Sequence, residues 1–183
     1  ANSIRRLIVY SEILDAETPA EKLKNFKGII LSGGPQSVYD PDSIKCDPEI
    51  FTLGIPILGI CYGHQLLVQM EGGMVETGTT KEFGLSEIKI TKAEGILQEL
   101  SSLQTVWMSH GDTVKALPIG YESLACTVND GFSVIGNFKK NFYGIQFHAE
   151  VTHTLSGMKI FDNFLHICGV TRDWKIENFI DQE

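Results

Sequence analysis

Two glycines flank a cysteine in the segment Gly59-Ile60-Cys61-Tyr62-Gly63, between an apolar run and a stretch with helical spacing. A G-x-C-x-G pattern at a strand-to-helix junction is typical of a nucleophile elbow, because small flanking residues allow a tight turn that exposes the central side chain. The start of a helix also favours a thiolate, because its dipole and free N–H groups stabilise negative charge. The pattern predicts that Cys61 is a nucleophile. Taken alone, it fits a buried structural cysteine with turn glycines equally well.

A thiol nucleophile needs a base, and that base needs an acceptor that fixes its tautomer. His148 ends the strand-like run FYGIQFH, and Glu150 follows two residues later, so both side chains can point to the same side of an extended chain. We expect Cys61, His148 and Glu150 to form a triad that only the fold can assemble, since they are far apart in the sequence. Without Cys61, the pair reads as an ordinary strand-end histidine with a surface glutamate.

Two further polar segments follow apolar, strand-like runs. In SGGP (32–35), two glycines let the backbone approach a ligand and direct N–H groups at an oxyanion. In WMSHGD (107–112), polar groups gather as they would at the rim of a pocket. Ligands of open α/β sheets bind at the carboxyl ends of the strands, so we expect these segments to share one site with Cys61 and His148.

Two other chemistries fit these segments less well. His148, Glu150 and His153 carry metal-binding groups, but the histidines are five residues apart after a strand, whereas zincins place them four apart on a helix. SGGPQS (32–37) is similar to the SGG-x-DS loop of ATP pyrophosphatases, yet Gln36 replaces the aspartate. We expect no metal site. We expect His64 and His166, both in predicted helices, to be surface or hydrogen-bonded structural residues.

Apolar runs and glycine stops predict the elements that position these residues. We expect a short helix near the start, an alternating strand at 9–14, and a helix that Thr18 caps and that ends before Gly28. The runs at 28–31 and 55–60 are fully apolar, as in strands buried on both faces of a parallel sheet. A helix follows Cys61 and ends at Gly72-Gly73.

From about residue 84 the pattern changes to short alternating strands. They lie at 84–91, 105–110, 122–128, 132–138 and 142–148, and a last helix begins near Thr152 or Thr154 and stops at Gly169. We therefore predict an α/β fold: an open, mostly parallel sheet flanked by helices, with an added region of antiparallel strands.

Composition excludes several classes of protein. With 183 residues, 43% hydrophobic and 21% charged, the sequence suits one globular domain and not a disordered chain. Fifteen basic against 23 acidic residues give a net charge of −8, with no basic run to follow a nucleic acid. No stretch approaches the roughly 18 apolar residues of a membrane span. The absence of a secretory signal and of any CxxC pair predicts a cytoplasmic protein with reduced thiols.

Four segments in order along the chain resemble the motifs of triad (class I) glutamine amidotransferases: ILSGGPQSVY, GIPILGICYGHQLL, VWMSHGD and YGIQFHAEVTHT. The resemblance covers nearly the whole sequence and, within the family, is greatest to the amidotransferase domains of GMP synthases. It implies a flavodoxin-like fold. The closing ICGVTRDWKIENFI resembles the stretch that leads into the synthetase part of two-domain bacterial-type enzymes.

The resemblance implies a role for each candidate residue. Cys61 would attack the carboxamide of L-glutamine to give a glutamyl thioester and ammonia, with His148 as base and Glu150 orienting it. Backbone N–H groups of Gly34 and Tyr62 would form the oxyanion hole. The glutamine-binding residues would be Gly33, Gln65, Ser109, His110 and Asp112, with Asp112 facing the α-ammonium and Trp107 in the wall beside them.

The resemblance also implies a division of labour. This domain would need no cofactor, whereas ATP and Mg²⁺ would bind only on an ATP-pyrophosphatase (synthetase) domain or subunit, which uses the ammonia to convert XMP to GMP. We expect residues 1–170 to be the amidotransferase domain and 171–183 to begin a linker or docking tail.

Two departures from the family pattern keep alternatives open. Ala149 replaces the proline between the histidine and the glutamate, which would loosen the geometry of Glu150. We expect the family's first strand to be missing from this sequence, since ANSIRR resembles the helix that follows that strand. A γ-glutamyl cysteine hydrolase on the same fold, and a glutamine-binding module with a silent triad, are the competing hypotheses.

Overall fold

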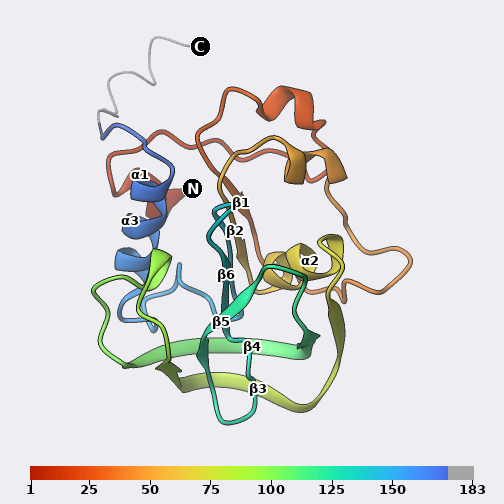
Figure 1. The fold of residues 1–183 in the computed structure, drawn as a ribbon, viewed down its shortest axis with the longest axis vertical. Coiled ribbons are helices and arrows are strands. Elements are labelled where there is room, and N and C mark those ends of the chain that lie inside the picture. The colour runs from red at the N-terminus through yellow and green to blue at the C-terminus, as the bar shows by residue number, and fades with distance from the viewer. Residues whose placement is uncertain (173–183) are drawn as a thin grey trace.

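The computed structural model describes residues 1–172, which form one mixed sheet with helices on both faces (Figure 1). The helices are α1 (Asn2–Arg5), α2 (Tyr62–Met70) and α3 (Gly157–Ile167), with 3-10 helices η1 (Ala20–Leu23), η2 (Pro48–Thr52) and η3 (Gly95–Leu97). The strands are β1 (Ile29–Leu31), β2 (Ile57–Ile60), β3 (Met74–Ile90), β4 (Leu103–Ala116), β5 (Glu122–Cys126), β6 (Val134–Asn137) and β7 (Phe142–Ile145). No helix among these residues is both long and apolar enough to cross a membrane.

The strand order is β1-β2-β7-β6-β5-β3-β4. Parallel pairing joins β1 to β2 and β2 to β7, and antiparallel pairing joins the remaining neighbours. The α/β class is confirmed, with a parallel part of three strands and a larger antiparallel region than expected. The parallel strands end on the same side of the sheet, where Cys61 follows β2 and His148 comes three residues after β7.

Alternation along the central strands divides the core into two layers. Leu58 of β2 and Ile145 of β7 pack with α1 and α3, whereas Ile57 and Phe142 pack with α2 and η2. Figure 1 shows α1 and α3 on one side of the central strands and α2 on the other. All four residues of β2 are buried, which explains its uninterrupted apolar sequence.

Two predictions near the N-terminus are wrong. Residues 9–14 alternate like a strand but form none, because β1 is the edge of the sheet and no neighbouring strand pairs with them; Ile13 is 83% exposed. The helix expected after Thr18 is reduced to the single turn of η1. Its cap is also different, since the carboxylate of Asp47 accepts a hydrogen bond from the backbone N–H of Ala20 at 2.9 Å.

The elements around the site follow the prediction more closely. β1, β2 and α2 lie where apolar runs and glycine stops placed them, and Gly72 takes the positive φ of 90° that ends α2. β3 and β4 are longer than predicted because they pair with each other as a hairpin. α3 begins later than expected, at Gly157, and Gly169 has a φ of 62° beyond its end.

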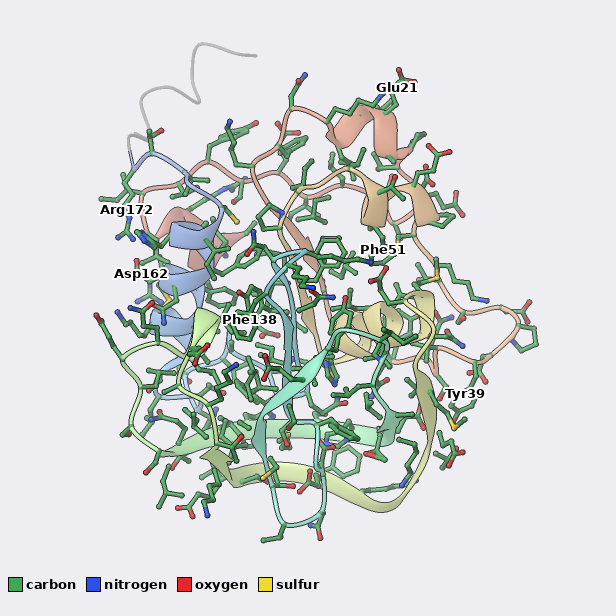
Figure 2. The ribbon with its side chains drawn as sticks, in the orientation of Figure 1. Glu21, Tyr39, Phe51, Phe138, Asp162 and Arg172 are labelled. Atoms are coloured by element: carbon green, nitrogen blue, oxygen red, sulfur yellow. The ribbon has the colours of Figure 1, made fainter. Side chains whose placement is uncertain are left out.

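The predicted docking tail lies almost entirely outside the described residues. Arg172 pairs with Asp162 of α3, on the side of the molecule opposite Tyr39 (Figure 2). The role of residues 171–183 stays a prediction.

Candidate active site

The turn at Cys61 explains the G-x-C-x-G pattern in steric terms. Cys61 has φ 52° and ψ −106°, a conformation that non-glycine residues rarely adopt. A Cβ on Gly59 would lie 2.4 Å from the carbonyl oxygen of Gly63, and a Cβ on Gly63 would lie 2.1 Å from the carbonyl oxygen of Leu31. Neither contact is possible, so only glycine allows β2, the turn and α2 to approach this closely.

The structure brings the three predicted catalytic residues together. Nδ1 of His148 lies 2.7 Å from Oε1 of Glu150, and the side chain of Cys61 interacts with the same ring. A Cβ on Gly33 would meet Cε1 of His148 at 3.1 Å and Cβ of Cys61 at 3.7 Å, which places this glycine against both side chains. The contact to Glu150 is complete with Ala149 in place of proline.

The charges of the pair follow from these contacts. Hydrogen bonds to Cys61 and to Glu150 raise the pKa of His148 to about 10, despite partial burial. Burial raises the pKa of Glu150, but the hydrogen bond from His148, the backbone N–H of Glu150 and the charge on His148 together lower it. The ring of His148 therefore holds a proton strongly: it can take one from a thiol and then donate it to a leaving group.

A buried threonine that the sequence did not reveal holds His148 in place. The hydroxyl of Thr154 donates to the carbonyl oxygen of His148 and accepts from the backbone N–H of Trp107 at 3.1 Å. The N–H of His148 in turn donates to the carbonyl of Trp107 at 3.0 Å. These contacts join the end of β7 to β4. No local pattern could predict them, because Trp107 and Thr154 are 47 residues apart.

The glycine loop lies beside the elbow, as predicted. A Cβ on Gly34 would lie 3.4 Å from Cγ of Tyr62, the first residue of α2. The N–H groups of a first helical turn have no partner within the helix. The backbone of Gly34 and the start of α2 thus lie next to Cys61, where the predicted reaction would need donors for an oxyanion.

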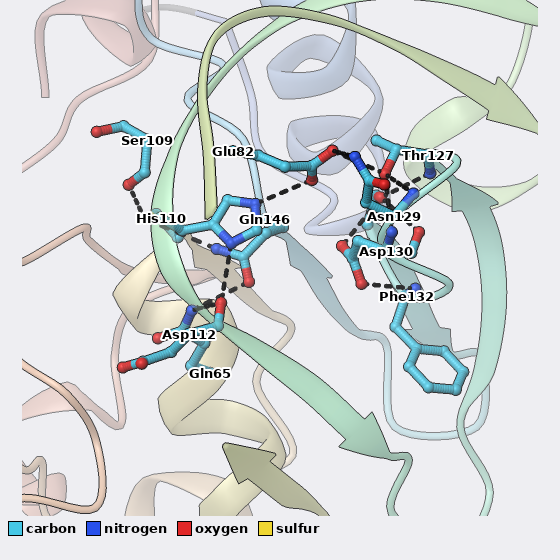
Figure 3. Close-up of polar contacts among 12 residues, drawn as sticks. Gln65, Glu82, Ser109, His110, Asp112, Thr127, Asn129, Asp130, Phe132 and Gln146 are labelled. Atoms are coloured by element: carbon cyan, nitrogen blue, oxygen red, sulfur yellow. Dashed lines mark hydrogen bonds and ion pairs between the residues drawn. The ribbon is translucent and has the colours of Figure 1, made fainter. Parts of the chain in front are cut away.

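Apart from Gly33, which follows β1, the predicted glutamine-binding residues lie on α2 and β4 (Figure 3). The carbonyl oxygen of Ser109 lies 3.6 Å from Sγ of Cys61. Nε2 of Gln65 donates to the carbonyl of Asp112 and to Oε1 of Gln146, both at 3.1 Å. Gln146, which the sequence did not single out as a site residue, is fully buried, and its Nε2 lies 3.8 Å from Sγ of Cys61.

Asp112 and His110 differ in what they offer a ligand. The carboxylate of Asp112 accepts hydrogen bonds from the hydroxyls of Ser37 and Tyr39, neither of which the sequence had singled out, and remains partly exposed. His110 is 6% exposed and both its ring nitrogens contact protein groups, Glu82 and the carbonyl of Asp112. Its side chain therefore supports the backbone of β4 and does not present a free nitrogen to a ligand.

The other three histidines lie outside the predicted triad and the predicted glutamine-binding residues. His166 is exposed as expected, but His64 is fully buried and neither ring nitrogen has a hydrogen-bond partner, so the prediction for His64 is wrong. Burial lowers the pKa of His64 to about 3, which keeps the ring neutral. The ring of His153 packs on Trp107 with centroids 4.7 Å apart. Within residues 1–172, no group of three histidine, cysteine, aspartate or glutamate side chains could hold a metal ion.

Comparison with known proteins places this geometry in a family. The family described as "Glutamine amidotransferase class-I" matches residues 1–168, and the chain belongs to it. The solved structure of a protein from Thermoplasma acidophilum, described as a putative subunit of GMP synthase, superposes with a TM-score of 0.82 at 28% identity. The match covers all of this chain and 89% of the other.

Curated relatives carry a more specific name. A GMP synthase [glutamine-hydrolyzing] from Brachyspira hyodysenteriae is 49% identical over 98% of this chain and 36% of its own length. A probable GMP synthase [glutamine-hydrolyzing] from Leptospira interrogans is 45% identical over the whole chain and 31% of its own length. This chain thus spans about a third of the length of these relatives, in which the matching region is one part of a larger protein.

Proposed function

We propose that this chain hydrolyses L-glutamine to glutamate and ammonia, and supplies the ammonia to a synthetase part that aminates XMP to GMP. The observation that carries the proposal is the juxtaposition of Cys61, at a strained elbow, with the His148–Glu150 pair at 2.7 Å. A nucleophile, a proton carrier and backbone donors are what acyl transfer requires.

The reaction follows from these positions. The thiol proton of Cys61 passes to His148 as Sγ attacks the carboxamide carbon, and the negative charge that forms on the oxygen meets the N–H groups of Gly34 and Tyr62. His148 gives its proton to the departing nitrogen, so the C–N bond breaks, ammonia leaves and a glutamyl thioester remains. His148 then takes a proton from water, which attacks the thioester and releases glutamate and the thiol. Glu150 keeps the ring oriented throughout.

The pocket wall supplies recognition of the amino acid. The partly exposed carboxylate of Asp112 suits the α-ammonium group, because an ionised pair of this kind gives strong, directional hydrogen bonds. The carbonyl of Ser109 lies beside Sγ of Cys61 and Gln65 contacts the backbone of Asp112, so both residues adjoin the proposed binding site. Gly33 leaves room for the substrate next to His148, where a larger residue would stand.

Ammonia release from glutamine tests the activity. The natural chain should release ammonia, and Cys61→Ala should lower the rate about a thousandfold or more, since the covalent route is lost. A glutamine-like diazoketone, 6-diazo-5-oxo-L-norleucine, should form a single adduct on Cys61 that free glutamine prevents, as measured by peptide mass spectrometry. Ammonia release that survives in Cys61→Ala would refute the mechanism.

The same assay separates the alternatives. A γ-glutamyl hydrolase would cleave γ-glutamyl peptides faster than glutamine. A silent module would bind glutamine by calorimetry without releasing ammonia. For the acceptor step, the chain mixed with its ATP-pyrophosphatase (synthetase) domain or subunit should form GMP from XMP, ATP, Mg²⁺ and glutamine. The Cys61→Ala variant should retain this only with added ammonium salt.

A further inference from the structure

A second carboxylate–histidine pair, this one buried, is formed by Glu82 of β3 and His110 of β4 (Figure 3). Oε2 of Glu82 lies 3.2 Å from Nε2 of His110, and the two side chains are 7% and 3% exposed. The register of the β3–β4 hairpin breaks between Thr77 and Glu82, so that Glu82 stands opposite His110. Neither the triad nor the substrate contacts described above use Glu82.

Its hydrogen bonds fix the carboxylate of Glu82 as an acceptor. Oε1 faces the hydroxyl of Thr127 at 3.0 Å and Nδ2 of Asn129 at 3.4 Å. The Thr127 hydroxyl already accepts from the backbone N–H groups of Asn129 and Asp130, so its own proton points to Glu82. Thr127 and Asn129 thereby hold Oε1 of the carboxylate, and Oε2 is directed at His110.

The ring of His110 transmits this constraint to the pocket. Its Nδ1 lies 2.8 Å from the carbonyl oxygen of Asp112, which can only accept, so Nδ1 carries a proton. The same carbonyl accepts from Gln65. The main chain of Asp112 is thus held by two side chains, and the orientation of one of them depends on Glu82.

We propose that Glu82 is a positioning residue of the glutamine pocket: through the ring of His110 it fixes the backbone at Asp112, and so orients the carboxylate that receives the α-ammonium of the substrate. This inference rests on the proposed glutaminase function. It assigns Glu82 an effect on recognition of the amino group and none on the reacting atoms, because Cys61, His148 and Glu150 contact neither Glu82 nor Thr127 in any hydrogen bond of residues 1–172.

Substrate discrimination tests the proposal. In Glu82→Ala the nitrogen Nε2 of His110 stays buried without a partner, and we expect kcat/KM for glutamine to fall about 10- to 100-fold, mainly through KM. For glutaramate, which is glutamine without the α-amino group, we expect a change below about threefold. The alkylation rate of Cys61 by iodoacetamide should stay unchanged, because the triad is not disturbed. Equal losses for glutamine and glutaramate would overturn the proposal.

Two further variants make the test specific. In Glu82→Gln, the donors at Oε1 hold the amide oxygen in place, so the amide N–H₂ faces Nε2 of His110, and His110 keeps its proton on Nδ1 for Asp112. We expect this variant to retain most of the glutamine selectivity. In an Asp112→Ala background, Glu82→Ala should have little further effect, since the group it orients is gone. Additive losses would contradict the inference.

Hydrogen exchange keeps the inference distinguishable from the proposed function. Amide exchange at residues 109–112 should accelerate in Glu82→Ala but not in Glu87→Ala, an exposed change on the same strand. If the natural chain neither releases ammonia nor takes up the diazoketone, the proposed function fails, while this measurement still tests the positioning. Unchanged exchange at 109–112 in folded Glu82→Ala would refute it.

Discussion

The backbone strain at Cys61 leads to an unusual order of stability among substitutions. At most positions glycine destabilises a protein relative to alanine, because it frees the unfolded chain. At residue 61 the φ of 52° with ψ of −106° penalises every residue that has a Cβ. We therefore compare Cys61→Gly with Cys61→Ala, which both remove the sulfur and differ only in this atom.

The expected difference is the sum of three contributions. Relief of backbone strain favours glycine by about 2 kcal/mol. The greater freedom of the unfolded chain favours alanine by about 0.7 kcal/mol. Burial of one methyl group, at a site that is 5% exposed, favours alanine by about 0.8 kcal/mol. The net result is that Cys61→Gly unfolds with a free energy about 0.5 kcal/mol higher than that of Cys61→Ala.

Urea unfolding followed by tryptophan fluorescence measures this difference, with equal m-values as the check that both variants unfold alike. The same pair at Asp162, in the middle of α3, is the matched control, and there glycine should be less stable than alanine by about 1 kcal/mol. The order of the two residues should reverse between the two sites. If alanine is the more stable by about 1 kcal/mol at both, residue 61 stores no strain and the steric account of the elbow is wrong.

Four further predictions concern the triad and the fold. In Cys61→Ala, the pKa of His148 measured by NMR should fall well below about 10, because the largest contribution to its rise is removed; a value that stays near 10 would contradict this. Since the folded pKa of His148 lies above the ordinary 6.5, its protonated ring stabilises the fold fully below pH 6.5. This contribution should fade as pH rises towards 10, as measured by denaturant midpoints. In His148→Gln the midpoints should lack this decline. Glu150→Gln should lower kcat for glutamine about 100-fold with little change in circular dichroism; a rate near that of the natural chain would exclude Glu150 from the triad. Asp47→Asn should lower the melting temperature at neutral pH but not at pH 2. Backbone N–H groups lower the pKa of this carboxylate, so its contribution to stability is lost as pH falls. An equal drop in melting temperature at both pH values would refute the capping role.

The local sequence was sufficient to predict an element wherever its residue pattern shows the constraint that forms it. The turn glycine at 59, the buried apolar run of β2 and the glycine stop of α2 each reflect steric or burial constraints that a few neighbouring residues reveal, and each was predicted correctly. Gly63 was also predicted at the turn, although the group that excludes a side chain there is the carbonyl of Leu31 on another strand. The spacing of His148 and Glu150 in an extended chain was also enough to predict their contact.

Strand formation at residues 9–14 shows the limit of such patterns. Alternation gives a strand two suitable faces, but a strand also needs the N–H and C=O groups of a neighbour, and β1 pairs only with β2. The cap of η1 shows the same limit. The N–H of Ala20 is capped by the carboxylate of Asp47, which lies 27 residues away in the sequence and could not be identified from a local pattern.

The sequence by itself determined the nucleophile elbow, the histidine–glutamate pair and the strands and helix that carry them, because these depend on contacts within a few residues. Only the tertiary structure decided that Thr154 joins the two sides of the site, that Asp112 is held by Ser37 and Tyr39, and that Glu82 supports His110. The physical reason is that a buried polar group must find a partner wherever the fold supplies one, and the distance along the chain then carries no information.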